Sequence, residues 1–299
     1  MNRRAFLASA AVVVPALDAA ASFPIVDTQA HFYDPSRPQG VPWPPKDDKV
    51  LYRTVLPPEY IGIAKPLGIT GVIEVEASPW LEDNQWVLDL ADKYPIIVGT
   101  VGDLEPGKPD FRKNLARFHK NRRFRGIRLG ELWGRNFAGE TQFSSDLNAL
   151  AAAGLELDVV GGPPLLSQVV RLTDRIPELR IVIDHLPFDP PAERAGRSAY
   201  EAALRELGHR PQVYAKVSNV LRKQNGRVPD NVNFYRPSLD QLWDIFGPDR
   251  LVYGSNWPVS NLIAPYPAVF KVVREYFAGK GREASEKYFW KNSKAAYRW

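Results

Sequence analysis

The stretch Leu251-Val252-Tyr253-Gly254-Ser255-Asn256-Trp257-Pro258 joins a short apolar run to a cluster of small and polar residues. Two other segments share this design, namely Asp27-Thr28-Gln29-Ala30-His31 near the start of the chain and Asp184-His185-Leu186 in its middle. In each segment the polar residues stand where a predicted strand ends. Catalytic residues of a (β/α)₈ barrel lie at the carboxyl ends of its strands. The three segments therefore predict one site assembled from strand ends.

Short runs rich in β-branched residues alternate along the chain with amphipathic stretches, which implies parallel strands joined by right-handed crossovers. An open doubly wound sheet would need a glycine-rich turn after its first strand, and none follows 24–28. Eight strand–helix units in roughly 275 residues match a barrel. We therefore expect an α/β fold, a closed parallel (β/α)₈ TIM barrel. The predicted strands are 24–28, 71–76, 96–101, 126–129, 156–160, 180–184, 213–216 and 251–253.

Helical spacing of apolar residues marks the segments between these runs. Ser145 and Ser238 are the expected N-caps of two helices, and Gly154 is the expected end of one. Two long insertions, 35–58 and 221–237, follow the first and seventh strands, so both should lie over the catalytic face. The predicted helices are 84–93, 110–118, 145–152, 165–175, 195–207, 238–246 and 266–277.

The first residues have the pattern of an export signal. Arg3 and Arg4 precede an apolar run, 8–17, and small residues follow at 19–21. Paired arginines before Phe-Leu resemble a twin-arginine signal, and the apolar run is too short to span a bilayer. We expect a signal peptide over 1–21, a single domain over 22–299, and a periplasmic or exported protein without stable membrane insertion.

Composition limits the partners of the chain. Its 299 residues are 44% hydrophobic and 24% charged, with a formal net charge of +5. Because the basic residues are dispersed, we expect a small-molecule substrate and no nucleic acid. Cysteine is absent, which excludes disulfides, thiolate metal sites and a cysteine nucleophile. Homo-oligomerisation is left open.

Two of the four histidines, His31 and His185, stand at strand ends of the expected catalytic face, whereas His119 and His209 map to the surface. Imidazole titrates near neutral pH, so His185 beside Asp184 is a candidate proton shuttle.

Further candidates stand at the ends of other predicted strands. Glu76 is the candidate carboxylate of the second strand, with Glu74 expected on the opposite side of it. Arg128 could bind a carboxylate or carbonyl through its planar guanidinium, or pair with Glu76. Lys216 is a candidate substrate contact or a structural ion-pair partner, and Trp257 a candidate pocket wall.

The opening segment from Ile25 to Pro35 resembles the first strand of the amidohydrolase-related metal-dependent hydrolases. Further similarities are Gly126-Ile127-Arg128, Val182-Ile183-Asp184-His185-Leu186, the segment 246–259 and Asn292-Ser293-Lys294-Ala295-Ala296-Tyr297. The most similar branch contains sugar lactonases and pyrone-dicarboxylate lactonases. The resemblance covers 24–299 and implies a TIM-barrel hydrolase.

The chain departs from this family at two positions. The family's first strand ends in His-x-His, and this chain has Gln29 in place of the first histidine and His31 as the second. His185 matches the family's sixth-strand histidine. The eighth-strand aspartate is replaced by Asn256, and the fifth-strand histidine of decarboxylase-like relatives has no counterpart in 157–160. Amides are poor ligands for Zn²⁺, and an amide cannot act as a base. Gln29 and Asn256 can instead donate hydrogens to a carbonyl or an oxyanion.

These observations predict hydrolysis of a small polar ester, a lactone, without bound metal or another cofactor. The catalytic candidates are His185, His31, Glu76 and Asn256, and the substrate-binding candidates are Gln29, Arg128, Trp257 and Lys216. Two alternatives remain open. The first is a periplasmic binding or vestigial barrel without turnover. The second is a zinc hydrolase with the ligands His31, Glu76 and His185.

Overall fold

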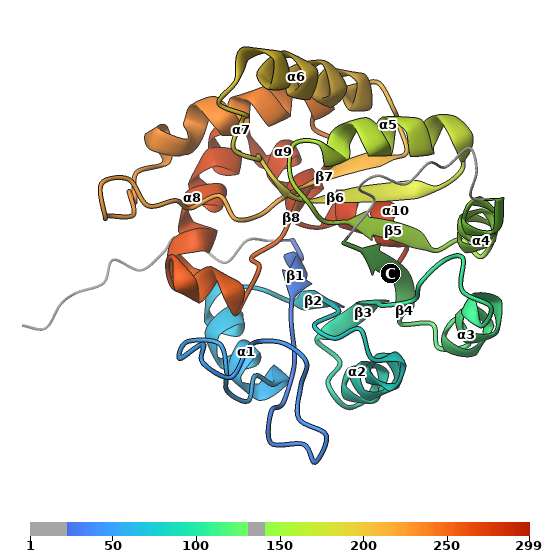
Figure 1. The fold of residues 1–299 in the computed structure, drawn as a ribbon. Helices are drawn as coiled ribbons and strands as arrows, with labels where there is room; N and C mark the ends of the chain where they lie inside the picture. Colours follow the sequence, from blue (N-terminus) through green and yellow to red (C-terminus); the bar gives the residue numbers. More distant parts are fainter. Residues whose placement is uncertain (1–22, 131–140) are drawn as a thin grey trace, which may run out of the picture.

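Eight parallel strands, each overlapping its predicted run, succeed one another in chain order around a barrel (Figure 1). The computed structural model describes residues 23–130 and 141–299, so the predicted signal 1–21 lies outside the described residues. The strands are β1 (Val26–Ala30), β2 (Gly71–Val75), β3 (Ile97–Gly102), β4 (Phe124–Leu129), β5 (Glu156–Val159), β6 (Arg180–Leu186), β7 (Val213–Val217) and β8 (Leu251–Tyr253).

The barrel closes between its first and last strands. The Thr28 hydroxyl donates to the Tyr253 carbonyl at 2.7 Å. Just beyond the strand ends, the His31 amide donates to the Trp257 carbonyl at 2.9 Å, next to a parallel bridge between Ala30 and Trp257. This seam confirms the predicted TIM barrel and joins two of the three polar segments that end β1, β6 and β8.

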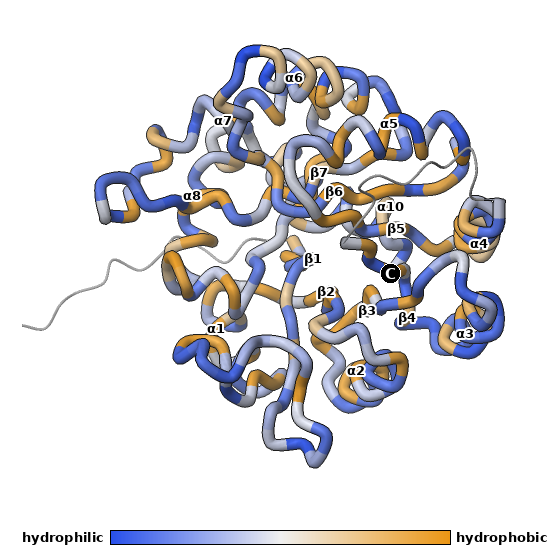
Figure 2. The backbone as a smooth tube through the Cα atoms, viewed as in Figure 1, coloured by the Kyte–Doolittle hydropathy of each residue, from blue (hydrophilic) through white to orange (hydrophobic). Residues whose placement is uncertain are grey.

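Helices surround the barrel, and Figure 2 shows hydrophilic stretches along the outer helices α3 and α6. The predicted caps Ser145 and Ser238 are wrong, because both residues lie inside helices, and Asn231 caps the longer α7. Gly154 does follow a helix end, with φ +74°. The helices are α1 (Pro57–Ala64), α2 (Leu81–Lys93), α3 (Phe111–Phe118), α4 (Thr141–Ala152), α5 (Leu165–Arg175), α6 (Arg194–Gly208), α7 (Val232–Phe246), α8 (Tyr266–Gly279), α9 (Arg282–Glu286) and α10 (Asn292–Tyr297), with single turns at Lys65–Leu67, Val259–Leu262 and Lys287–Lys291.

Apolar side chains form two core layers. The larger layer lies between strands and helices, and a small one fills the barrel interior around Val26, Ile73 and Val252. The last helix, α10, closes the lower end of the barrel, where Tyr297 joins the interior layer and Arg180 donates to the Ala296 carbonyl at 2.8 Å. Because α10 covers this end, the polar segments that end the strands lie at the opposite end of the barrel.

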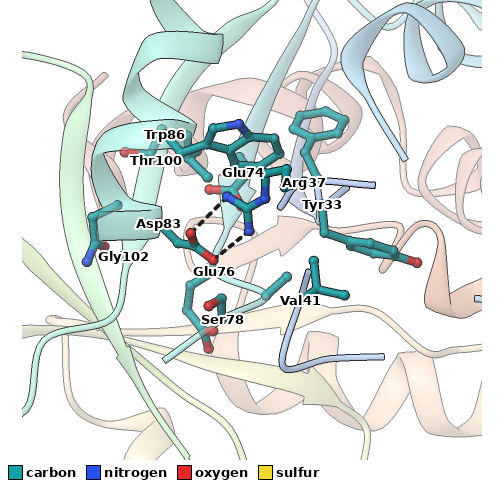
Figure 3. A pocket seen from close by; sticks show the side chains of 14 residues that line it. Tyr33, Arg37, Val41, Glu74, Glu76, Ser78, Asp83, Trp86, Thr100 and Gly102 are labelled. Carbon is teal, nitrogen blue, oxygen red and sulfur yellow. Dashed lines mark hydrogen bonds and ion pairs between the residues drawn. The ribbon is translucent and has the colours of Figure 1, made fainter. Parts of the chain in front are cut away.

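The insertion between β1 and α1 is held against α2. Arg37 donates two hydrogen bonds to Asp83, at 2.9 and 3.0 Å, and its guanidinium lies 4.4 Å from the centre of the Trp86 ring. Figure 3 shows this contact from close by.

Among the described residues, no helix combines the length and apolar character needed to cross a membrane.

Candidate active site

Side chains from the ends of β1, β7 and β8 meet at the top of the barrel. The Asn256 amide lies against His31, with Oδ1 3.1 Å from Nε2, and Gln29 Nε2 lies 3.4 Å from the same nitrogen. Lys216, from β7, donates to Gln29 Oε1 at 2.7 Å. The structure therefore brings together four of the residues singled out from the sequence, all of them almost completely buried.

Three residues of this region have a left-handed backbone conformation. The φ angles are +63° at His185, +53° at Asn219 and +57° at Asn256. Residues other than glycine seldom adopt this region, and such strain tends to gather at functional sites. The conformation lets Asn256 donate through Nδ2 to Asn219 Oδ1 at 2.8 Å. Backbone strain thus accompanies the placement of His185 and Asn256.

The hydrogen-bond partners of His31 define its tautomer. Nδ1 lies 2.8 Å from the Val75 carbonyl, which can only accept, so Nδ1 carries a hydrogen. Burial, reinforced by the charge of Arg128, lowers the pKa of His31 to about 3, so the ring is neutral at pH 7 and Nε2 holds a lone pair. Gln29, whose Oε1 accepts from Lys216, directs its Nε2 hydrogens toward this lone pair from 3.4 Å. His31 is therefore an acceptor that faces the Gln29 amide donor.

The tautomer of His185 is the opposite one. Nδ1 lies 2.8 Å from the Ser218 hydroxyl, which is buried and has no other polar partner among the described residues. The hydroxyl must donate to Nδ1 to avoid a buried unsatisfied hydrogen, which leaves the hydrogen of the ring on Nε2. Burial lowers the pKa of His185 to about 4. This partly exposed side chain thus offers a neutral N–H donor to the site.

Lys216 is a fully buried cation. Its ammonium donates to Asp158 at 2.6 Å and to Gln29 at 2.7 Å, and it forms an ion pair with Asp184 at 2.7 Å. These three groups surround the ammonium inside the barrel. Lys216 therefore orients the Gln29 amide, with Nε2 turned toward His31, and it is not placed to contact substrate directly.

Arg128 and Glu76 form an ion pair. The guanidinium donates through Nε to Glu76 Oε1 at 2.7 Å, and it lies 3.8 Å from Asp184. The expectation that Glu74 and Glu76 face opposite sides of β2 is wrong, because side chains two residues apart share a face. Both line a cavity of about 20 Å³ beneath Arg37 (Figure 3). Burial raises the pKa of Glu74 well above its usual value.

Trp257 does not line the site. It is fully buried, with its ring 5.5 Å from the Tyr60 ring and 6.3 Å from the Phe32 ring. After the left-handed turn at Asn256 the chain directs this ring into the outer core, which the sequence does not reveal. Trp43 of the insertion stands over the site instead, with its ring 5.9 Å from that of His31.

A larger cavity, of about 420 Å³, opens beside Arg128 at the ends of β3 and β4. Its lining includes the polar side chains of Asp103, Glu105, Lys108 and Asn114. Asp103 was not predicted from the sequence, although it stands two residues after the strand run 96–101, much as the other site residues stand near the ends of theirs. The cavity has the size of a small-ligand site.

The donors at the site do not fit a zinc ion. Among the described residues, no three His, Asp or Glu side chains are grouped so as to hold a metal. Of the ligand set left open by the sequence, Glu76 is bonded to Arg128, and amides surround Nε2 of His31. The carboxylates nearby, Asp158, Asp184 and Glu76, already pair with Lys216 and Arg128, so none of them is free to bind a zinc ion.

Comparisons with known proteins agree on one family. A family model described as amidohydrolase matches residues 26–299. An L-fucono-1,5-lactonase of Burkholderia ambifaria is 31% identical over 240 residues, which cover 79% of this chain and 81% of the relative. These matches confirm the resemblance to the lactonase-like branch.

Solved structures show the same fold. A zinc-bound amidohydrolase from Burkholderia multivorans superposes with a TM-score of 0.79 at 24% identity, covering 92% of this chain and 99% of the other. A probable 2-pyrone-4,6-dicarboxylic acid hydrolase from Acinetobacter baumannii, with citric acid bound, has a TM-score of 0.71 at 17% identity, covering 93% and 100%. The barrel architecture is therefore shared throughout these chains.

Proposed function

This chain belongs to the amidohydrolase family and is a hydrolase, and we propose that it opens the ring of a sugar-acid lactone. The observation that carries the proposal is the cluster of amide and imidazole groups from Gln29, His31 and Asn256, with His185 close enough for its charge to act on His31. Such donors stabilise the oxyanion that forms when a carbonyl is attacked. The substrate class follows the L-fucono-1,5-lactonase relative, and the polar wall of the 420 Å³ cavity suits a polyhydroxylated ring.

In this proposal each side chain has a defined task. The amide hydrogens of Gln29 and Asn256 and the guanidinium of Arg128 bind the lactone carbonyl and the oxyanion that it becomes. His185 donates its Nε2 hydrogen toward the ring oxygen as the bond to it breaks. Lys216 acts through Gln29, since its hydrogen bond to Oε1 holds the amide in one orientation and polarises the N–H groups.

We propose further that this hydrolysis needs no metal, because the positive charge of the site comes from Lys216 and Arg128. The B. multivorans structure contains zinc, and at 24% identity it supports only the fold. A zinc hydrolase with the ligands His31, Glu76 and His185 would require Glu76 to leave Arg128. A binding barrel without turnover is the other rival, and it would bind lactones without releasing product.

Export of the protein to the periplasm is a separate proposal. The pattern of Arg3, Arg4 and the apolar run 8–17 supports export by a twin-arginine route to the periplasm. Replacing both arginines with lysine should keep the protein inside the cell with its N-terminus uncleaved. Normal export of that variant would refute the route.

A panel of sugar-acid lactones and pyrone dicarboxylates tests the function. Ring opening releases one proton, so a pH indicator follows it directly. We expect at least one sugar-acid lactone to open far above its spontaneous rate, and Gln29→Met to lower kcat about 10²- to 10³-fold through the lost oxyanion donor. The matched control is His209→Ala in the α6–β7 turn. If no lactone opens, or if the Gln29 variant is as active as the parent, the proposal fails.

A further inference from the structure

Lactone hydrolysis needs a group that takes a proton from water, and the residues expected to do so are otherwise engaged. Asn256 cannot accept a proton. Glu76 is bonded to Arg128, and the lone pair of His31 is surrounded by amides. The Nδ1 lone pair of His185 accepts from Ser218. The proposed site therefore has abundant donors and lacks an evident base.

Asp103 is a carboxylate without a partner. It follows β3 directly, it is partly exposed, and it lines the 420 Å³ cavity together with Arg128. Neither of its carboxylate oxygens has a hydrogen bond or an ion pair within 23–130 and 141–299. Its neighbour Glu105, by contrast, pairs with Lys108 at 3.4 Å. Asp103 thus presents a free carboxylate to the place where a small ligand fits.

The backbone of Asp103 is held by a buried side chain. Asn84 of α2 donates through Nδ2 to the Asp103 carbonyl at 2.9 Å, and the Asp103 amide donates to Asn84 Oδ1 at 2.9 Å. Gly102 makes room for this contact, because a Cβ there would lie 2.0 Å from Asn84 Oδ1. A buried side-chain amide that binds both backbone polar groups of one residue is the kind of support that a precisely placed catalytic group requires.

We propose that Asp103 is the general base of the hydrolysis, an inference that rests on the proposed function. Its carboxylate takes a proton from water as the water oxygen bonds to the lactone carbonyl carbon, and the C=O electron pair moves onto the carbonyl oxygen. The resulting oxyanion collapses and the bond from carbon to ring oxygen breaks, while the ring oxygen accepts a hydrogen bond from His185 Nε2 and takes a proton from solvent. Asp103 returns its proton to solvent, and the product acid releases one proton at neutral pH.

The charges around Asp103 suit this role. Burial, with repulsion from Glu76 and Glu105, raises the pKa of Asp103 to about 7, and only Arg128 opposes the rise. Lys108 also lines the cavity. A base acts in its deprotonated form, so kcat/KM should rise with pH up to about 7 and level off above it.

Asp103→Asn tests the proposal, with wild type and Asp92→Asn as comparisons, because Asp92 is an exposed aspartate of α2. We expect Asp103→Asn to lower kcat by about 10²-fold or more and to remove the acidic limb of the pH profile. Asp103→Glu should keep the limb at a reduced rate, and Asp92→Asn should match wild type. If wild type opens a lactone and Asp103→Asn opens it at a near-normal rate, the role proposed for Asp103 is overturned and the proposed function stands. A wild type that opens no lactone would overturn the proposed function together with it.

Thermal stability separates a catalytic carboxylate from a structural one. The raised pKa means that ionised Asp103 costs the folded state stability above pH 7, and this cost vanishes below the unfolded pKa of about 4. Asp103→Asn should therefore melt at a higher temperature than wild type at pH 8, with no such gain at pH 4. A lower melting temperature at pH 8 would show a structural role and contradict the proposal.

Discussion

His31 and His185 present different nitrogens to the site, and their hydrogen-bond partners decide which. The Val75 carbonyl holds the hydrogen of His31 on Nδ1, whereas the Ser218 hydroxyl holds that of His185 on Nε2. Burial keeps both rings neutral at pH 7. Two identical side chains therefore have different tasks, one as an acceptor for amides and one as a donor to substrate.

Replacing the donor should slow the reaction. His185→Ala removes the hydrogen aimed at the ring oxygen, and we expect kcat to fall by at least about 10²-fold. His119→Ala, at the end of α3, is the matched control. Steady-state kinetics on the best lactone of the panel would measure both, and a near-normal rate for His185→Ala would exclude the donor role.

Lys216 should matter for stability as much as for rate. Lys216→Met leaves Asp158 buried without its counter-charge and Asp184 with only Arg128, and breaking a buried pair typically costs about 3–5 kcal/mol of unfolding free energy. Both aspartates are ionised in the unfolded chain above its pKa of about 4, so the loss should be larger at pH 8 than at pH 4. Urea unfolding at the two pH values measures this, with the exposed Lys271→Met as control. An equal, small loss in both variants would contradict the buried network.

Several site residues could be predicted from the sequence because their position after a strand defines them. The structure brings Gln29, His31, Lys216 and Asn256 together for this reason. Asp103 carried the same signal and was missed, because no histidine or tryptophan drew attention to its strand. Trp257 was misplaced, since the left-handed turn before it is a backbone property that side-chain pattern does not show.

Among the elements, the β1–α1 insertion has the closest connection to function. Trp43 stands over His31, and the contact of Arg37 with Asp83 and Trp86 fixes the insertion to α2. Arg37→Ala should release the insertion and raise KM by roughly tenfold with a smaller change in kcat. It should also speed proteolysis within 36–56.

Arg53→Ala is the control for this variant, because Arg53 lies in the same insertion and makes an exposed ion pair with Glu59. Kinetics and limited proteolysis of the two variants would measure the effect. Equal KM values and equal cleavage would show that the Arg37 contact does not restrain the insertion.

Element boundaries were harder to predict than element order. The start of α7 was predicted at Ser238 because Gln241 three residues on completes a capping-box pattern, yet Ser238 and Pro237 both lie inside the helix and Asn231 is the cap. Helix α1 was hidden in the proline-rich insertion, where Pro57 stands at the start of the helix. Proline is tolerated in the first turn of a helix, so its presence marks a start as readily as an interruption.

At the scale of the whole molecule, the barrel explains how dispersed segments form one site. Parallel strands place their carboxyl ends at one rim, and α10 seals the other end. The fold was predictable because eight strand–helix alternations in one chain permit few other arrangements. The charge network inside the barrel was not, since pairings such as Lys216 with Asp158 depend on which strands become neighbours across the interior.

The most direct test is the rate of lactone opening by protein treated with a chelator, with the metal content of the same sample measured. We expect an undiminished rate at substoichiometric metal, because Lys216 and Arg128 supply the cations of the site. A rate that disappears with the chelator and returns with about one equivalent of zinc would contradict this expectation.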